Sequence, residues 1–255
     1  MTKILALANQ KGGVGKTTTA INLGASVAAC ERRVLLVDLD PQANATSGIG
    51  ILDPERSMYD VLIEKMPLAD IILPTEIPTL FVAPGSVDLV AAEVELREAI
   101  GREYYLKRVL DPVARDYDYV FIDLPPSLGL LTVNGLTAAN SVLVPLQTEY
   151  FALEGVSQLL ATIERVQGAV NPGLEIEGIV LTMYDDRMNL TRQVAEEVRT
   201  HFGDKVYRTV IPRNIRLSEA PSFGKPIILY DIRSRGSEAY VSLAREFIQR
   251  AENVI

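Results

Sequence analysis

The chain has 255 residues, 48% hydrophobic and 23% charged, with a formal net charge of −8, which allows one large α/β domain or two small ones. Its single cysteine, Cys30, excludes an internal disulfide and any cysteine-rich metal or iron–sulfur site built by one chain. Apolar runs such as 179–181 are too short to span a bilayer, and the N-terminus lacks the apolar stretch of a secretion signal, so we expect a cytoplasmic protein.

Short β-branched runs alternate with longer helical patterns along the chain, which indicates βα units and a mainly parallel sheet. The expected strands are Ile4–Ala8, Val34–Asp38, Leu80–Ala83, Tyr119–Asp123, Ser141–Pro145 and Ile176–Met183, with weaker candidates at Val206–Val210 and Ile227–Ile228. Helices are expected near residues 16–30, 87–99, 104–115, 152–169, 190–202 and 237–251. Several strands are nearly all apolar, as strands covered on both faces are. The pattern predicts an α/β fold with helices on both faces of a twisted, mostly parallel sheet.

The least regular segment is Leu52–Pro78, where Pro54, Pro67, Pro74 and Pro78 interrupt the pattern. We expect an insertion with a short helix there, at about residues 52–78. No internal repeat or Gly/Ser linker divides the chain, and no helix-turn-helix pattern precedes the first strand. A single domain, residues 1–255, is therefore the expected organisation.

Residues 10–18 carry the strongest functional signal, because they follow the first strand and open a helix rich in Ala, Ile and Leu, the context of a phosphate-binding P-loop. The glycines of this loop are Gly12, Gly13 and Gly15. They let successive backbone N–H groups turn toward phosphate oxygens, and the following helix N-terminus adds partial positive charge. Lys16 can then reach the β- and γ-phosphates, and the Thr17 hydroxyl can ligate Mg²⁺. The alternative, a glycine-rich turn without a ligand, is poorly supported because Gly-Lys-Thr has few other uses here.

The loop departs from the common G-x-x-x-x-G-K-[ST] pattern, since Gln10 occupies the first glycine position. It carries a second lysine, Lys11, five residues before Lys16. We expect Lys11 to reach the phosphates of a facing subunit rather than those of its own chain, the alternative being a solvated surface lysine. The loop thus predicts nucleotide held between two copies of the chain.

Carboxylates follow two of the predicted strands at their C-terminal ends, where open α/β sheets bind ligands. Asp123 closes the strand that begins at Tyr119, and we expect it to hold Mg²⁺ directly or through water. Asp38 and Asp40 end the strand that begins at Val34. Each of these acids could instead only cap a turn, and Asp40 precedes a proline as turn-starting aspartates often do.

The acidic chain contains one basic region, because residues 185–235 hold ten Lys and Arg against seven Asp and Glu. Clustered basic residues are what phosphate backbones require. The only histidine, His201, lies in a predicted helix beside this region, and we expect a surface or packing role for it. Without a Ser/His or Cys/His pairing near the loop, nucleophilic hydrolase chemistry has no support.

Taken together, these motifs resemble the deviant Walker A ATPases of the ParA/MinD group, and within it the chromosome-partitioning branch called ParA or Soj. The segments that carry the resemblance are residues 9–18, 37–46, 121–127, 148–155 and 211–222. They spread over nearly the whole chain, so the resemblance does not rest on one short motif.

The resemblance implies a P-loop NTPase fold and weak hydrolysis of ATP with Mg²⁺. Its nucleotide-binding positions are Lys11, Gly12, Gly13, Val14, Gly15, Lys16, Thr17 and Thr18. Asp40 matches the acid that positions or activates the attacking water, alongside Lys11 and Lys16 as catalytic residues, while Asp38 lies nearer the magnesium shell with Thr17 and Asp123. Pro212 would pack on the adenine, and Asn214 would recognise its polar edge.

The resemblance also implies partners. Arg187, Arg213 and Arg216 match arginines with which the family binds DNA without sequence preference. An ATP-dependent homodimer would double their number on one surface, and hydrolysis stimulated by a ParB-like centromere-binding protein would release the DNA. The location would then be cytoplasmic and nucleoid-associated. The alternative is that these arginines pair with nearby acids, such as Asp185 and Glu219, as a solvated surface.

Two other branches of the group make different predictions. A membrane-associated regulator like MinD ends in a basic amphipathic helix, whereas Ser237–Ile255 holds Arg245 and Arg250 against three glutamates, which does not favour anionic lipid. We therefore expect no membrane partner, and keep this reading as the alternative. The nitrogenase-reductase type needs cysteines for a bridging cluster, and Cys30 has no second cysteine beside it.

Overall fold

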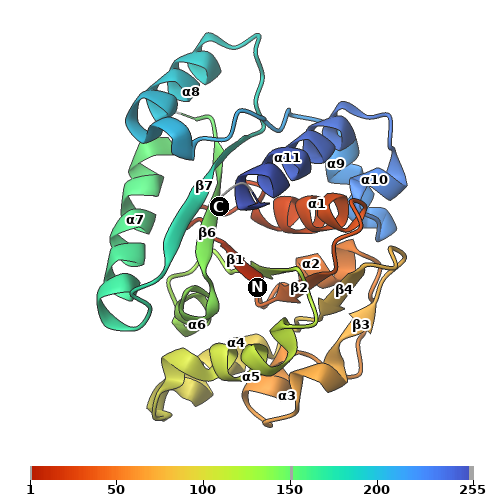
Figure 1. Cartoon of the computed structure of the whole chain (residues 1–255), viewed down its shortest axis with the longest axis vertical. Coiled ribbons are helices and arrows are strands. Elements are labelled where there is room, and N and C mark those ends of the chain that lie inside the picture. The colour runs from red at the N-terminus through yellow and green to blue at the C-terminus, as the bar shows by residue number, and fades with distance from the viewer. Residues whose placement is uncertain (1, 150–151, 253–255) are drawn as a thin grey trace.

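The computed structural model describes residues 2–149 and 152–252, and its centre is a seven-stranded sheet with the strand order β3-β4-β2-β5-β1-β6-β7 (Figure 1). The strands are β1 (Lys3–Leu7), β2 (Val34–Asp38), β3 (Leu73–Pro74), β4 (Leu80–Ala83), β5 (Tyr119–Asp123), β6 (Ser141–Gln147) and β7 (Glu175–Thr182). All neighbours pair in parallel except the short edge strand β3, which is antiparallel to β4. The predicted α/β class with a mostly parallel sheet is confirmed.

Alternation along the strands divides the core into two layers. In β1, Leu5 and Leu7 pack into one hydrophobic cluster, while Ile4 and Ala6 pack into the other. Because successive side chains of a strand point to opposite faces, apolar residues at every position require cover on both sides. The sheet is therefore a buried middle layer.

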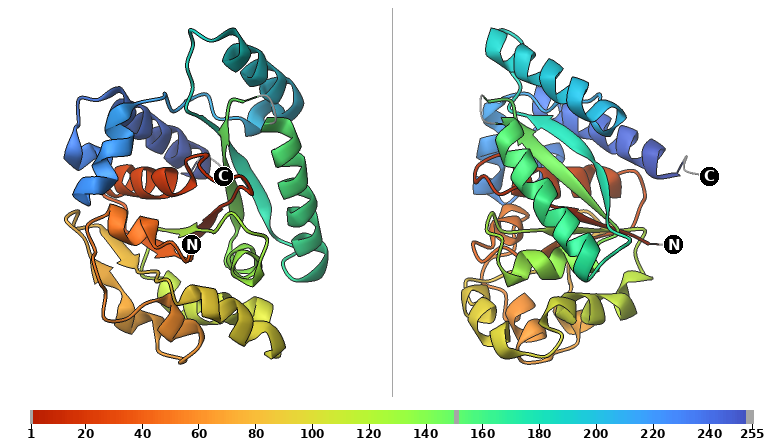
Figure 2. Two further views of the ribbon diagram at one scale, coloured as in Figure 1. Left: turned by 180° about the vertical axis from the view of Figure 1, so that it is seen from behind. Right: turned by 90° about the vertical axis from the view of Figure 1, so that its left-hand side faces the viewer.

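Helices supply that cover on both faces (Figures 1 and 2). They are α1 (Lys16–Ala28), α2 (Asn44–Gly48), α3 (Met58–Leu62), α4 (Leu89–Glu95), α5 (Tyr105–Ala114), α6 (Leu130–Ala138), α7 (Ala152–Ala169), α8 (Asn189–Phe202), α9 (Ile215–Glu219), α10 (Ile227–Tyr230) and α11 (Arg235–Glu252). The short α2 and the helices α1 and α9 to α11 contribute to one cluster, and α3 to α8 contribute to the other. In Figure 1, α1 and α11 lie side by side over the sheet.

The predicted strand bounds of β2, β4 and β5 are matched, and those of the other predicted main strands differ by one or two residues. The irregular segment 52–78 holds α3, a 3₁₀ turn at Leu68–Ile71 and β3. Helix α6 was not predicted. Part of the last predicted helical stretch, residues 253–255, lies outside the described residues.

Both weaker strand predictions are wrong. Val206 makes only an isolated bridge with Ile179, and the segment after it gives the N–H groups of Arg208 and Thr209 to the Glu246 carboxylate instead of to a strand. Ile227–Ile228 begins α10, where the side chain of Asn22 accepts the N–H of Ile227 at 2.6 Å. In both places a side-chain oxygen accepts backbone N–H groups that would donate to a neighbouring strand if the β-branched residues formed a strand.

Candidate nucleotide site

The glycine-rich loop joins the C-terminal end of β1 to the first turn of α1. Gly13 and Gly15 have φ angles of +74° and +86°, a backbone region that favours glycine. A Cβ added at Gly12 or Gly13 would meet no atom within 4 Å. The concave side of the loop is therefore open beside a helix N-terminus, the arrangement that binds phosphate.

Buried side chains at the ends of neighbouring strands hold this loop in place. The Thr182 hydroxyl, at the end of β7, donates to the carbonyl of Val14 at 2.8 Å. The Asn9 amide donates to the carbonyl of Pro145 in β6 at 2.8 Å, and its oxygen accepts the N–H of Lys11 at 3.0 Å. The loop is thus tied to the ends of β6 and β7 before any ligand binds.

Lys16 is the buried cation of the site, with 6% of the residue exposed. Burial lowers the pKa of its ammonium group, and the negative charges of Asp123 and Asp40 partly oppose that shift. These three predicted site residues therefore lie close enough to interact electrostatically. A poorly hydrated ammonium at the mouth of a phosphate loop interacts strongly with an incoming anion, because little water must be displaced from it.

Asp123 lies fully buried beside the loop. No described donor makes a well-formed hydrogen bond to its carboxylate oxygens, although the Thr17 hydroxyl is near enough to act on its pKa. Burial and then the charge of Asp38 raise its pKa well above the usual value, while Thr17 and Lys16 act in the opposite direction. Such an unsatisfied carboxylate, next to a threonine hydroxyl, fits a hard divalent cation. Within the described residues no three His, Cys, Asp or Glu side chains form a metal cage. Mg²⁺ is usually held by one or two carboxylates with substrate phosphates and several waters.

Asp38 and Asp40 both cap turns as well as facing the site. Asp38 lies opposite Asp123 in the β2–β5 register, and its carboxylate accepts from the N–H and the hydroxyl of Thr46 at 2.8 and 2.7 Å and from the N–H of Asp40 at 3.2 Å. Burial raises the pKa of Asp38 to about 6. Asp40 accepts the N–H of Gln42 at 2.9 Å through one oxygen. Of the three acids, Asp123 is the one with both oxygens free for a metal.

A hollow of about 400 Å³, here called the base hollow, opens beside the loop. Its lining includes Gly15, Thr18, Thr182, Met183, Pro212 and Asn214. The Asn214 side-chain oxygen caps α9 by accepting the N–H of Arg216 at 2.9 Å, which leaves its amide NH₂ for a ligand. Pro212 offers a flat apolar ring. The structure thus brings both predicted adenine contacts to the phosphate loop.

Lys11 points away from its own loop and pairs with Glu149. The ammonium nitrogen lies 2.5 Å from a Glu149 oxygen, and both side chains are about half exposed, at 52% and 50%. Gln147 holds the other Glu149 oxygen at 2.5 Å. Residues 150–151 of the 148–155 motif lie outside the described residues. An exposed ion pair of this kind is weak and can exchange for a better anion.

Two of the three predicted DNA-binding arginines, Arg187 and Arg213, line a hollow next to the base hollow. Residues 211–213 run along 181–184, with backbone hydrogen bonds from Ile211 to Leu181 and from Arg213 to Tyr184. Arg187 and Arg213 line a second hollow of about 1130 Å³, here called the arginine hollow, and Arg216 follows on α9. Pro212 and Arg213 line both hollows, so they form a common wall.

Several residues that shape the site were not predicted individually. Thr46 fixes Asp38, Glu149 holds Lys11, and Thr182 and Met183 line the base hollow. Thr182 could have been found by the same strand-end rule that indicates the aspartates. Met183 has a φ of +50°, and no sequence signal marks a methionine for that strained conformation.

Replacement of Asp123 by asparagine is expected to stabilise the nucleotide-free protein at pH 7 by about 1–3 kcal/mol, because a neutral amide replaces a buried, unpaired carboxylate. The raised folded-state pKa makes the folded wild type bind more protons than the unfolded chain above about pH 4, so its stability falls as the pH rises. The advantage of the variant should grow between about pH 4 and pH 7.

Urea unfolding at both pH values measures this difference, with the exposed Asp111→Asn as the matched control. A variant no more stable than wild type at pH 7 would show that the Asp123 carboxylate is already compensated within the folded chain.

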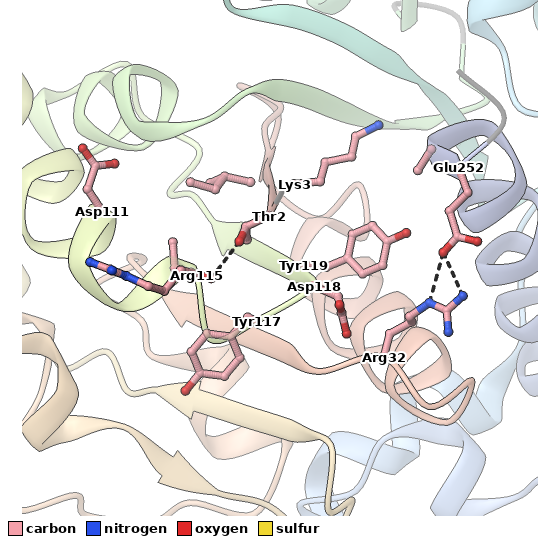
Figure 3. Close-up of a pocket in the computed structure, with 12 residues that line it drawn as sticks. Thr2, Lys3, Arg32, Asp111, Arg115, Tyr117, Asp118, Tyr119 and Glu252 are labelled. Carbon is pink, nitrogen blue, oxygen red and sulfur yellow. Dashed lines mark hydrogen bonds and ion pairs between the residues drawn. The ribbon is translucent and has the colours of Figure 1, made fainter. Parts of the chain in front are cut away.

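Another hollow, of about 590 Å³, lies at the opposite ends of the strands, where β1 and β5 begin (Figure 3). Two of its basic residues are paired within the chain: Arg32 pairs with Glu252 at 2.9 Å, and Lys3 pairs with Glu177 at 2.7 Å. Parallel sheets bind ligands at the carboxyl ends of their strands, and the phosphate loop lies there. The hollow at the amino ends is not the candidate site.

Comparisons with known proteins agree with this geometry. The model of a family described as AAA domain matches residues 2–176. The chain is 58% identical over 252 residues to chromosome partitioning protein ParA of Caulobacter vibrioides NA1000 / CB15N, which covers 97% of this chain and 94% of that protein. It is 59% identical over 248 residues to sporulation initiation inhibitor protein Soj of Bacillus subtilis 168, with 96% and 98% covered.

This chain is also similar to solved structures of other proteins that contain bound nucleotide and magnesium. Cobyrinic acid a,c-diamide synthase from Mycobacterium smegmatis, with bound ATP analog and magnesium, has a TM-score of 0.86 and 40% identity, covering 99% of this chain and 97% of that chain. The septum site-determining protein MinD from Pyrococcus horikoshii, complexed with Mg-ADP, has a TM-score of 0.83 and 27% identity, covering 100% and 98%. No helix in the described part of this chain is long and apolar enough to cross a membrane.

Proposed function

Because the chain belongs to the AAA domain family, in its branch of ParA/Soj chromosome-partitioning ATPases, we propose that it hydrolyses MgATP between two copies of itself and binds DNA in the ATP state. DNA is bound without sequence preference and released on hydrolysis, which a ParB-like centromere-binding protein stimulates. The chain works in the cytoplasm, on the nucleoid.

The observation that carries this proposal is the common wall between the two hollows. Pro212 and Arg213 face the base hollow on one side and the arginine hollow on the other. A nucleotide seated against Pro212 therefore contacts the same short segment that presents the arginines. Two ligands that contact the same segment can influence each other's affinity, because each ligand favours one position of that segment.

The residues of the chain divide the chemistry among them. The loop N–H groups and Lys16 grip the phosphates, and Asp40 accepts the proton of the attacking water or orients it. Thr17 and Asp123, with Asp38 nearby, would hold Mg²⁺, which would supply charge neutralisation at the bond that breaks. Intrinsic turnover is slow, as the resemblance to the weak ATPases of this family implies.

Lys11 links the reaction to the second copy. In one chain it pairs with Glu149 outside the loop. When two loops face each other, the phosphates of the partner's nucleotide offer Lys11 a more negative and less hydrated anion than an exposed carboxylate. The exchange stabilises the pair of chains only while a triphosphate is present.

Replacement of Lys11 by alanine is therefore expected to leave ATP binding within about threefold of wild type while the protein stays monomeric, because Lys16 and the loop still hold the nucleotide. Light scattering with MgATP measures the mass, and fluorescent-nucleotide titration measures the affinity. Lys65→Ala, at an exposed lysine in the segment 52–78, is the matched control. A normal ATP-dependent dimer of the Lys11 variant would contradict the bridging role.

Fluorescence anisotropy with a random-sequence DNA duplex tests the function as a whole. We expect binding with MgATP to be at least about tenfold tighter than with MgADP and to weaken steeply between about 50 and 200 mM salt, since arginine–phosphate contacts release counterions. Binding that is independent of nucleotide or resistant to salt would contradict it.

The alternative, a membrane-associated regulator like MinD, is less well supported. The apolar side chains of α11, among them Tyr240, Leu243 and Phe247, are buried in the cluster shared with α1, so this face is already covered. An interfacial helix needs such a face free for lipid. Strong ATP-dependent pelleting with anionic vesicles would favour the membrane reading over DNA.

A further inference from the structure

Two of the three proposed DNA-binding arginines are held by acids of their own chain. The Arg187 guanidinium donates to both oxygens of Asp185, at 2.8 and 2.6 Å. This contact holds the pKa of Asp185 down at about 2, so the carboxylate stays charged at any physiological pH. The Arg187 side chain is 85% exposed, so an approaching phosphate can reach it but must compete with Asp185 for its guanidinium.

Arg216 is held in a similar way. Its guanidinium donates to Glu219 at 2.8 Å, one turn along α9, and lies 3.5 Å from Asp231. The Tyr230 hydroxyl donates to the same Glu219 oxygen at 3.1 Å, which fixes the carboxylate beside the arginine. The acid is thus part of an ordered group and does not swing freely.

Other arginines of this surface are different. Arg213 and Arg235 both line the arginine hollow, and neither forms an ion pair with a described residue. The surface therefore mixes cations that can meet phosphate directly with cations that must first leave a carboxylate. The paired arginines lie on the loop after β7 and on α9.

We propose that Asp185 and Glu219 compete with DNA phosphates for Arg187 and Arg216 and so keep a single chain off DNA. This inference rests on the proposed function and specifies its regulation. The two acids set the affinity of one chain too low for stable binding, and the nucleotide-bound pair overcomes this by doubling the contacts.

The physical basis is the cost of opening each pair. An exposed Arg–carboxylate pair is weak, but once it opens the free carboxylate remains within a few ångströms of the incoming phosphate and repels it. Each acid also neutralises the charge of one arginine, so that fewer counterions are released when the chain binds DNA. With two such acids in each chain, a pair of chains carries four, which is enough to change the apparent affinity by orders of magnitude.

Isosteric amides separate this effect from the fold. Asp185→Asn keeps an oxygen that can accept the N–H of Arg187, which closes the local turn at 3.1 Å, and Glu219→Gln keeps an acceptor for Tyr230. Each variant loses the negative charge and one acceptor oxygen, which an NH₂ donor replaces, while the size of the side chain is kept. Asp111→Asn makes the same change in net charge at a Lys107 pair on α5, by the hollow at the amino ends of the strands, and is the matched control.

DNA anisotropy with the double variant should show at least about tenfold tighter binding than wild type in MgATP, and measurable binding in MgADP, with each single variant between these values. Asp111→Asn should behave as wild type. Variants that bind no more tightly than wild type, or a control that tightens equally, would overturn the inference while leaving the proposed function intact. Absence of DNA binding by every protein in every nucleotide state would overturn both.

Discussion

Replacement of Lys16 by alanine is expected to abolish ATP binding at physiological nucleotide concentrations. The ammonium is buried, its pKa is lowered by that burial, and it faces the open side of the loop between Asp123 and Asp40. Loss of a buried, charge-assisted contact of this kind weakens binding by at least about 100-fold in Kd. The loop N–H groups and the helix N-terminus remain, so a weak affinity for phosphate should persist.

Isothermal titration with the ATP analog and Mg²⁺ measures this loss, and Lys107→Ala on α5 serves as the exposed-lysine control. Circular dichroism of the nucleotide-free variant shows whether it is folded, because Asp123 and Asp40 lose their nearest cation. A folded variant whose Kd lies within about threefold of wild type would exclude Lys16 from the phosphate site.

Replacement of Asp40 by alanine is expected to reduce kcat for hydrolysis by about 100-fold or more while ATP binding and the paired state persist, because general-base or water-positioning residues contribute rates of that size. The pair would then be trapped on DNA. Single-turnover hydrolysis and light scattering with MgATP measure the two effects.

The turn-capping role of Asp40 requires a second variant. Its oxygen accepts the N–H of Gln42 at 2.9 Å, so alanine removes both a cap and a candidate catalyst. Asp40→Asn keeps an acceptor for that N–H but cannot take a proton. If Asp40 acts on water, both variants are inactive; an active asparagine variant beside an inactive alanine variant would assign Asp40 to the turn alone.

The main sheet was predictable because its strands are short apolar runs between helical patterns, and a parallel sheet demands that arrangement. Helix α6 was not, since its sequence contains Gly135 and the β-branched residues Thr132 and Val133, which favour other structures. Tertiary contacts form it: Asn134 accepts the N–H of Leu106 at 3.1 Å and donates to the carbonyl of Arg102 at 2.8 Å. Local propensity carries no information about such distant partners.

The candidate site also contains one part that the sequence predicted and one part that it did not. The phosphate loop and the aspartates follow from spacing and from the strand-end rule, so the sequence was sufficient to place them together. The Lys11–Glu149 pair joins residues 138 positions apart, and the clamp of Thr46 on Asp38 depends on how α2 folds back on β2. Neither the spacing nor the composition of the sequence predicts those contacts, although Glu149 does lie in a segment that carries the resemblance.

The same limit applies to the arginines. Their matched positions were predicted from the resemblance, and pairing with nearby acids was the stated alternative. The structure shows the pairing, since Arg187 and Arg216 form ion pairs with Asp185 and Glu219. The pairing does not conflict with the proposed DNA contacts, because an exposed ion pair can open when a phosphate approaches.

The central claim is that ATP assembles two chains into one DNA-binding unit, and the mass of the DNA-bound species tests it most directly. Sedimentation velocity of the Asp40→Ala protein with a labelled duplex and MgATP should give a complex that contains two chains, or a multiple of two, and MgADP should leave the duplex free. A single chain bound to the duplex, or the same complex in both nucleotides, would contradict the claim.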